Sequence, residues 1–517
     1  MAVEIGVLYF PGAPVAVLLL VAVYGVYRFF LDGLSRIPGP AIAKVTNLWK
    51  INAAAQAEMP WRNIALHRKY GPLVRIGPNM VSVNDPEAYP IINGFRRVFT
   101  KTQFYSTAEG WYKGKPLTTV ITARDRQYHS YLLRVASSAY SVGSTPQMEV
   151  KIQPLVDLLL NKLNDLGKAG QKPVDTATLI AHFAFDAMGI INVSEPFGFL
   201  SKGVDVEGAI GAIEVANTYF SVIAQAPWMH TFMLGNRFVQ KAMEGGNPVL
   251  NLALAMVDKR LATTAKPTTN GHHHPTPDST DFLGRLLSTS AESDDPSKPT
   301  YEQIVAFVLA NTMAGYATVA VALRSILYHL ARNPSAYTKL QHEIDTAFAS
   351  GALGSTPTHT HTAAEAGKLP YLDAVVTEAL RVHPVLGLIL EREVPAGGVV
   401  LAGQHVPAGT VVGFNPWVIM HNREVYGEDA EVFRPERWLG VEEGRLKEMR
   451  RCNISFGAGP RSCQGKNIGM MEILKVVPAL MRRFDFALAN PKDEWQVNGH
   501  WFTMQSKMDM TFTPRKH

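Results

Sequence analysis

The spacing of apolar residues predicts a chain built mainly from helices. Apolar residues recur every three to four positions in Gln153–Leu166 and in Ile304–Leu330, which places them on one face of a helix. Shorter apolar runs at Leu73–Ile76, Val81–Val83 and Val399–Leu401 predict strands. The strands are few and short, so the core is expected to be helical.

The chain opens with a stretch that has no charged residue from Ile5 to Tyr27, which is long enough to cross a bilayer as one helix. A cleaved signal peptide is the alternative, but such peptides usually begin with basic residues, and only Glu4 precedes this run. Basic residues follow it instead, and the positive-inside bias then places the main body in the cytoplasm. We therefore expect an uncleaved membrane anchor over residues 1–36 and one large domain over residues 37–517.

Two segments rich in Thr, Pro and His, residues 263–280 and 355–362, predict mobile surface loops. Three consecutive histidines, residues 272–274, raise a metal site as an alternative. A solvated loop is the interpretation that we favour for them.

Composition narrows the class of protein. The 517 residues carry a net charge of only +6 and no dense stripe of Lys and Arg, which argues against a nucleic-acid binder and favours a membrane surface or an acidic protein partner. Cys452 and Cys463 are the two cysteines, too few for a disulfide framework. The chain is therefore expected to face a reducing compartment, with any special cysteine kept for reactivity or metal binding.

The stretch FGAGPRSCQG, from Phe456 to Gly465, surrounds Cys463 with glycines. Glycines let backbone N–H groups approach a sulfur closely, and an apolar-periodic run after Cys463 predicts a helix whose N-terminal dipole stabilises an anion. Arg461 adds a cation for a nearby anionic group. A buried cysteine in a glycine-rich turn is the alternative.

Three further motifs each have a structural alternative. Glu378 and Arg381 share one helical face, as solvated ion pairs usually do. Arg437 of FRPERW can reach a carboxylate or can lie in a surface turn. Ala314–Thr318, AGYAT, places a Gly and a Thr inside a long apolar helix, where they loosen the helix or form a notch for packing.

Together, and in this order, these motifs make the chain resemble the cytochrome P450 family over nearly its whole length. Phrases such as IPGP and YGPLVRIGPN resemble fungal members of the pisatin demethylase-like type. The resemblance implies a mainly α prism fold with a small β lobe behind an N-terminal transmembrane helix. It also implies a haem, iron protoporphyrin IX, held between the helix that carries Thr318 and the helix after Cys463.

The same resemblance assigns roles to individual residues. Cys463 is the expected axial ligand of the iron, within a loop that includes Phe456 and Gly465, and thiolate donation favours O–O cleavage. Glu378, Arg381 and Arg437 are expected to brace that loop. The residues expected to meet the haem propionates are His129, Arg392 and Arg461, with Arg134 as a substitute for an arginine that the family usually has at the position of Leu133.

The chain departs from the family at Ala317, where an acidic residue usually precedes the threonine and relays protons. We expect Thr318 to be catalytic, with water or a substrate hydroxyl in place of the missing acid.

The implied function is a monooxygenase of the endoplasmic reticulum membrane, single-pass with its catalytic domain in the cytoplasm. It is expected to oxidise a hydrophobic secondary metabolite with O2 and with electrons from NADPH-cytochrome P450 reductase, and cytochrome b5 is a further partner. The alternatives are an oxidative rearrangement, such as ring expansion, desaturation or coupling, and a haem-binding protein without turnover. Expected substrate-facing stretches are Phe104–Val120, Ala181–Phe220, Val385–Ile389 and Trp501–Met504.

Overall fold

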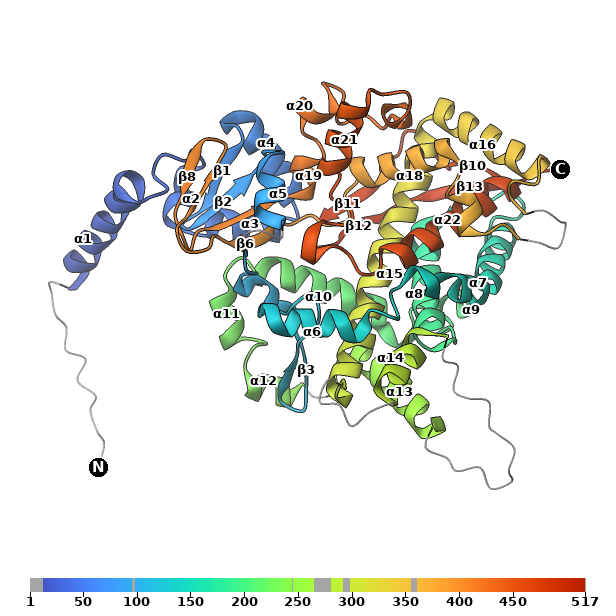
Figure 1. Ribbon diagram of the computed structural model, residues 1–517, viewed down its shortest axis with the longest axis horizontal. Helices are drawn as coiled ribbons and strands as arrows, with labels where there is room; N and C mark the ends of the chain where they lie inside the picture. Colours follow the sequence, from blue (N-terminus) through green and yellow to red (C-terminus); the bar gives the residue numbers. More distant parts are fainter. Residues whose placement is uncertain are drawn as a thin grey trace.

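The computed structural model describes residues 13–94, 98–243, 245–264, 280–291, 298–354 and 360–516. Helices make up most of the molecule, and the strands gather in small sheets, as the apolar spacing predicts. Figure 1 shows β1, β2, β6 and β8 beside α2 to α5 at one end, while the long helices fill the rest.

The helices follow one another along the whole chain. They are α1 (Ala13–Val26), α2 (Ala41–Val45), α3 (Leu48–Ala55), α4 (Met59–Tyr70), α5 (Ala88–Asn93), α6 (Arg126–Ala136), α7 (Thr145–Leu166), α8 (Thr176–Val193), α9 (Phe199–Lys202), α10 (Ala209–Ile223), α11 (Pro227–Phe232), α12 (Arg237–Ala242), α13 (Pro248–Thr264), α14 (Phe282–Ala291), α15 (Tyr301–Arg332), α16 (Pro334–Ala349), α17 (Ala363–Ala366), α18 (Pro370–Val382), α19 (Pro416–Ile419), α20 (Arg423–Tyr426), α21 (Glu443–Cys452) and α22 (Lys466–Arg483). Short 3-10 turns include Gln103–Ala108, Pro435–Trp438 and Gly459–Arg461.

The strands form two sheets and three hairpins. They are β1 (Leu73–Gly77), β2 (Met80–Val83), β3 (Gly110–Tyr112), β4 (Lys115–Leu117), β5 (Val174–Asp175), β6 (Leu390–Glu393), β7 (Val399–Leu401), β8 (Gln404–Val406), β9 (Val411–Phe414), β10 (Phe484–Leu488), β11 (Gln496–Gly499), β12 (Thr503–Ser506) and β13 (Asp509–Pro514). The larger sheet has the order β1-β2-β9-β6, in which β2 and β9 are parallel and the other pairs antiparallel. The second sheet has the order β10-β13-β5.

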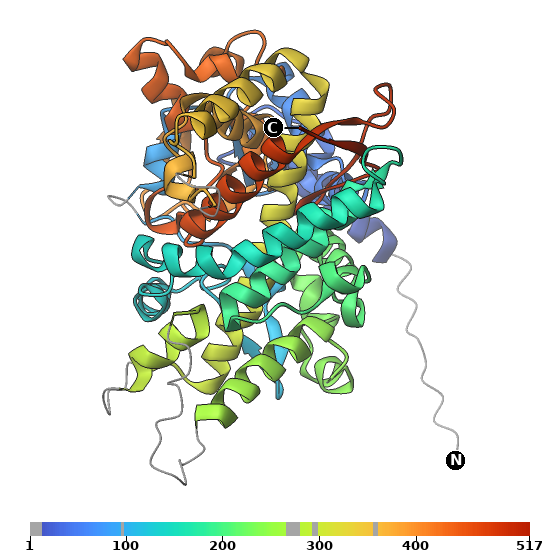
Figure 2. The same ribbon diagram turned by 90° about the vertical axis from the view of Figure 1, so that its right-hand side faces the viewer.

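The long helix α15 is the axis of the helical core. It packs against α8, α13, α18 and α22, and most of its side chains are buried. Figure 2 shows α22 running alongside α7 in front of this core. Thr300 caps the N-terminus of α15 through a reciprocal hydrogen-bond pair with Gln303, which explains why the helix begins there.

The N-terminal helix α1 leaves its apolar side chains exposed. Leu18, Leu20 and Val23 are each more than half exposed, unlike the apolar residues of the core. The apolar helix Leu18–Leu31 is shorter than a membrane span, and the expected anchor begins outside the described residues. In the described part, the two helices long enough to cross a membrane are α8 and α15, and both are mostly buried as core helices.

The segment after α1 is tied to the β lobe. The Asp32 carboxylate pairs with the buried guanidinium of Arg75 at 2.5 Å, and Leu34 and Ile37 are buried in the same core. Asp32 and Leu34 therefore contact the globular body, although the boundary predicted from the sequence lies after residue 36.

The two predicted loops fall largely outside the described residues, which omit 265–279 with its three histidines and 355–359. At the described end of the second loop, the prediction of mobile surface is wrong. His361 is buried, its Nε2 lies 3.1 Å from the carbonyl oxygen of Leu474, and Thr362 caps α17.

Candidate active site

The glycine-rich loop before α22 turns sharply around Cys463. Gly457 and Gly459 both have φ of +64°, the left-handed region that side chains disfavour. A Cβ on Gly459 would lie 2.0 Å from the carbonyl oxygen of Asn93, so no other residue fits there. The Cys463 N–H donates to the carbonyl of Phe456 at 2.8 Å, which closes the turn.

The environment of the Cys463 sulfur is only partly as predicted. The Cys463 side chain has accessible surface, although the surrounding protein buries the thiol enough to raise its pKa. A side chain with both properties faces a space inside the protein. Backbone N–H groups of Gly465 and Lys466, at the start of α22, oppose the shift by donating to the sulfur. The helix head is therefore confirmed, but burial outweighs it, and a bound cation must complete the stabilisation of a thiolate.

Four basic side chains converge near this loop without a carboxylate among them. They are Lys101, His129, Arg392 and Arg461, and within the described residues none of them forms a salt bridge. Burial, with repulsion from Arg392, lowers the pKa of Arg461 to about 10, and burial with the other three cations lowers that of His129 to about 3. Mutual repulsion among buried cations marks a site for a dianionic ligand.

The residues predicted to meet such a ligand differ in their placement. His129 and Arg392 are buried and Arg461 is half-buried, within reach of one another's charges. Arg134 is exposed near the end of α6, so its predicted role stays a prediction. Lys101 was missed because nothing in its local sequence marks it, and only the fold brings it to Arg461 and Arg392.

The buried carboxylate of Glu378 is the centre of a dense hydrogen-bond network. It accepts from Arg381 Nη2 at 2.7 Å, from Arg437 Nε at 3.2 Å and from Trp438 Nε1 at 2.9 Å. Both guanidinium groups are buried, so the solvated alternatives are wrong for this pair and for Arg437.

Hydrogen bonds to backbone carbonyls link this network to α21, the helix that precedes the cysteine loop. Arg381 Nη1 donates to the carbonyls of Met420 and Ala430, and Arg437 donates to that of Tyr426. The Tyr426 hydroxyl in turn donates to the carbonyl of Met449 at 2.9 Å, in the helix that precedes the loop. This path supports the predicted bracing role.

In the AGYAT motif on α15, Gly315 serves helix packing, whereas Thr318 is available for chemistry. A Cβ on Gly315 would lie 2.2 Å from the Met188 sulfur of α8, so Gly315 is the predicted notch for packing. Ala317 is fully buried. Thr312, six residues before Thr318, bonds the carbonyl one turn back, whereas the half-buried Thr318 hydroxyl has no hydrogen-bond partner among the described residues. Thr318 is therefore free to bind a ligand.

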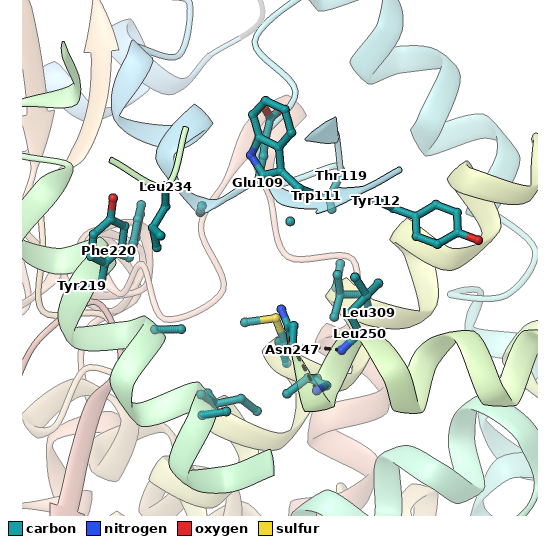
Figure 3. Close-up of a pocket in the computed structure, with 18 of the residues that line it drawn as sticks. Glu109, Trp111, Tyr112, Thr119, Tyr219, Phe220, Leu234, Asn247, Leu250 and Leu309 are labelled. Atoms are coloured by element: carbon teal, nitrogen blue, oxygen red, sulfur yellow. Dashed lines mark hydrogen bonds between the residues drawn. The ribbon is translucent and has the colours of Figure 1, made fainter. Parts of the chain in front are cut away.

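A cavity of about 750 Å³ lies beside α15. Its wall includes Leu309, Met313 and Ala314, and Ala314 lies one helical turn before Thr318. Figure 3 shows Trp111 and Glu109 on one side of the cavity and Phe220 and Tyr219 on another, all around a common space.

The predicted substrate-facing stretches are confirmed in part. Residues from 105–119, 211–220 and 501–502 line the cavity, but Val385–Ile389 does not. Several residues of 230–243 and residues 245–251 also line it, and they were missed because their pattern does not distinguish a cavity wall from ordinary helix packing.

The deciding observation comes from comparison with known proteins. The sequence profile of the family described as Cytochrome P450 matches residues 38–511. This chain belongs to the cytochrome P450 family. It is 36% identical over 477 residues to a cytochrome P450 monooxygenase of Aspergillus terreus, covering 92% of this chain and 94% of that protein.

Other relatives agree over similar lengths. Cytochrome P450 monooxygenase cicH of Emericella nidulans is 34% identical, with 92% of each chain covered. Cytochrome P450 monooxygenase gsfF of Penicillium aethiopicum is 32% identical, with 96% of this chain and 98% of that protein covered. This P450 is thus an oxidoreductase of the monooxygenase class with haem as its cofactor, and the alternative of a haem protein without turnover is not supported.

The residues of this P450 fit a haem. The accessible sulfur of Cys463 is a donor for iron. A Cβ on Gly465 would meet no protein atom within 4 Å, so packing within the chain does not require a glycine at this position, and the space beside it is open. The cluster of four basic side chains, with Arg392 and Arg461 in it, offers the positive charge that two propionates require. When bound, the haem supplies the activation of O2.

Proposed function

We propose that this P450 hydroxylates a hydrophobic small molecule, a fungal secondary metabolite, at the membrane of the endoplasmic reticulum. The apolar cavity that ends one turn from Thr318 is the observation that carries the proposal. Its aromatic and aliphatic lining favours an apolar substrate that partitions into lipid. Relatives from three fungal genera support the fungal setting.

The cavity wall, Thr318, the basic cluster and the Glu378 network have separate roles in the proposed reaction. The cavity wall excludes water and orients the substrate, while Thr318 Oγ1 is free to hold a proton-donating water or a substrate hydroxyl. Ala317 cannot move a proton, so Thr318 takes the whole of that task from α15. The basic cluster and the Glu378 network keep the cofactor and the sulfur in place.

Two exposed apolar surfaces support attachment to a membrane. One is α1, and the other is carried by α11 and α12, where Trp228, Phe232 and Phe238 are 64%, 75% and 75% exposed. Figure 1 places these three helices toward the same side of the molecule. Large aromatic residues are favoured at the interface of a bilayer.

Truncation tests this attachment. Deleting Met1–Leu31 leaves Asp32 to pair with Arg75, so we expect a folded, haem-loaded protein that is partly released from microsomes. Removing Trp228, Phe232 and Phe238 as well should release the rest. Full release by the first deletion alone would contradict a role for α11 and α12.

We assign electron supply to NADPH-cytochrome P450 reductase, with cytochrome b5 as a further donor. The decisive experiment is expression with this reductase in microsomes, fed with extracts of a fungal strain that lacks the gene, under 18O2. A product that carries one labelled oxygen supports the proposal. A product without label contradicts monooxygenation.

Oxidative rearrangement is the second candidate, and Ala317 is the observation that favours it. The usual acid beside Thr318 is missing, so the site departs from the family at the position that relays protons, and a substrate radical formed by hydrogen abstraction can end in rearrangement instead of oxygen insertion. The same labelling experiment separates the two, because ring expansion, desaturation or coupling leaves no 18O in the product.

A further inference from the structure

One carboxylate, that of Glu109, is present among the described residues that line the cavity. Glu109 immediately precedes the hairpin β3–β4 and lies beside Trp111, as Figure 3 shows. It is half-buried, and the Thr118 hydroxyl donates to its Oε1 at 2.8 Å. A carboxylate on a mostly apolar wall requires an explanation, since burial without partners is costly.

Several other polar side chains of the cavity are occupied by the protein itself. Asn217 both accepts from the N–H and donates to the carbonyl of Phe502, and Asn247 accepts from the N–H groups of Val249 and Leu250. Three more bond within the wall: Gln240 to Leu234, Asn251 to Gly245, and Tyr219 to His230. Glu109 is therefore the strongest acceptor with lone pairs left for a ligand.

The surroundings of Glu109 select the kind of donor. Arg124 already attracts its charge, and the Arg124 Nε donates to the carbonyl of Lys101, which belongs to the cluster of four basic side chains. An ammonium group would add a further positive charge to this side of the cavity, whereas a neutral hydroxyl would not. Burial raises the pKa of Glu109, and the hydrogen bond from the Thr118 hydroxyl lowers it in part. A hydroxyl donor therefore stabilises the Glu109 carboxylate as a hydrogen-bond acceptor.

We propose that Glu109 anchors the substrate by accepting a hydrogen bond from a hydroxyl group on a ring-containing apolar molecule whose body lies against Trp111. The inference rests on the proposed function, since it names the substrate class of the same cavity. It makes Glu109 a specificity-determining residue.

The hairpin holds this anchor at a fixed position relative to α15. A Cβ on Gly110 would lie 3.1 Å from the Leu309 side chain, so the hairpin and the helix are in close contact. Leu309 and Ala314 lie on the same cavity wall, and Ala314 lies one turn before Thr318. A molecule held at Glu109 by its hydroxyl is thus directed with its apolar end toward Thr318.

The test measures binding to the haem-loaded full chain at pH 8 by quenching of tryptophan fluorescence and by calorimetry. The probes are 2-naphthol, 2-methoxynaphthalene and 2-(aminomethyl)naphthalene, which share one ring system and differ in the donor. The variants are Glu109→Gln, which weakens the acceptor at constant volume, and Thr118→Val, which frees an oxygen of Glu109. Glu214→Gln is the matched control, because Glu214 is exposed on α10 and does not line the cavity.

We expect Glu109→Gln to weaken 2-naphthol binding about tenfold and to leave the methoxy probe unchanged. Thr118→Val should strengthen 2-naphthol binding, and Glu214→Gln should change nothing. Equal binding of 2-naphthol by wild type and Glu109→Gln, or no binding by wild type, would overturn the anchor. A larger loss for the aminomethyl probe than for 2-naphthol would overturn the hydroxyl assignment. Missing product formation with reductase, while the naphthol differences persist, would overturn the proposed function alone.

Discussion

The side of the molecule that presents Cys463 and the side that forms the cavity are built on different principles. The first is held by buried charges and backbone turns: Glu378 alone accepts from three side chains, and Gly459 fits only as glycine. The second is lined mainly by apolar and aromatic side chains, and several of them, such as Leu309 and Phe220, also belong to the hydrophobic core. The comparison teaches that one side depends on specific polar partners, whereas the other should tolerate apolar substitutions that keep the side-chain volume.

The largest expected effect comes from Glu378→Ala. This change strands the buried guanidinium groups of Arg381 and Arg437, and breaking such a pair costs about 3–5 kcal/mol. We expect unfolded or haem-free protein in urea unfolding and in the absorbance spectrum. The matched control is Glu195→Ala, whose partner Lys259 is exposed, and it should cost less than about 1 kcal/mol. A stable, haem-loaded Glu378→Ala protein would erase the contrast between the two sides.

Gly459→Ala tests the loop itself. Gly459 and Gly440 have nearly equal φ, +64° and +65°, but a Cβ on Gly440 would meet no atom within 4 Å. Both changes should cost about 1–2 kcal/mol of backbone strain, and only Gly459→Ala should also displace the Asn93 carbonyl and lower haem content. Equal haem content in both purified variants would show that the close approach to Asn93 is not needed.

Thr318→Ala tests the chemical role of α15, one helical turn beyond the part of the helix that lines the cavity. Because the Thr318 hydroxyl has no partner in the described residues, its loss should hardly change stability, but NADPH should be consumed with more peroxide and several-fold less product. Thr312→Ala is the control, since that hydroxyl bonds Val308 and Asn192 instead. If coupling fell equally in both variants, the loss would reflect helix packing.

Ala317→Asp tests the position beside Thr318 from the opposite direction. A carboxylate there should shift products toward simple hydroxylation if the wild type rearranges its substrate, provided that it ionises in this buried place. Product ratios under 18O2 measure the shift. Unchanged ratios and unchanged coupling would leave Ala317 as helix packing alone.

The smallest effect is expected on the cavity side. Met313→Leu keeps the volume of the side chain while changing its shape, so stability should fall by less than about 1.5 kcal/mol. The product ratio or the affinity for substrate should change by a few-fold. A large drop in melting temperature with unchanged products would reverse the contrast drawn between the two sides.

How much the sequence predicts differs between the two sides for a physical reason. The helix α15, the head of α22 and the Glu378 network follow from apolar spacing and from motifs whose residues are close in the chain. Lys101 and the cavity residues of 230–243 and 245–251 could not be predicted, because the fold alone brings them to the site. For Cys463, the sequence predicts the helix head and leaves burial as an alternative, and only the fold shows that burial outweighs the helix head.

The most direct test of the account is the carbon monoxide difference spectrum of Cys463→Ser beside Cys452→Ser. Cys452 is fully buried in the β-lobe core, whereas the Cys463 side chain is accessible, so Cys463 is the candidate for a ligand. We expect Cys463→Ser to lose the red-shifted band of a thiolate-bound haem and Cys452→Ser to keep it. A red-shifted band that persisted in Cys463→Ser would contradict the assignment of this sulfur as the axial ligand.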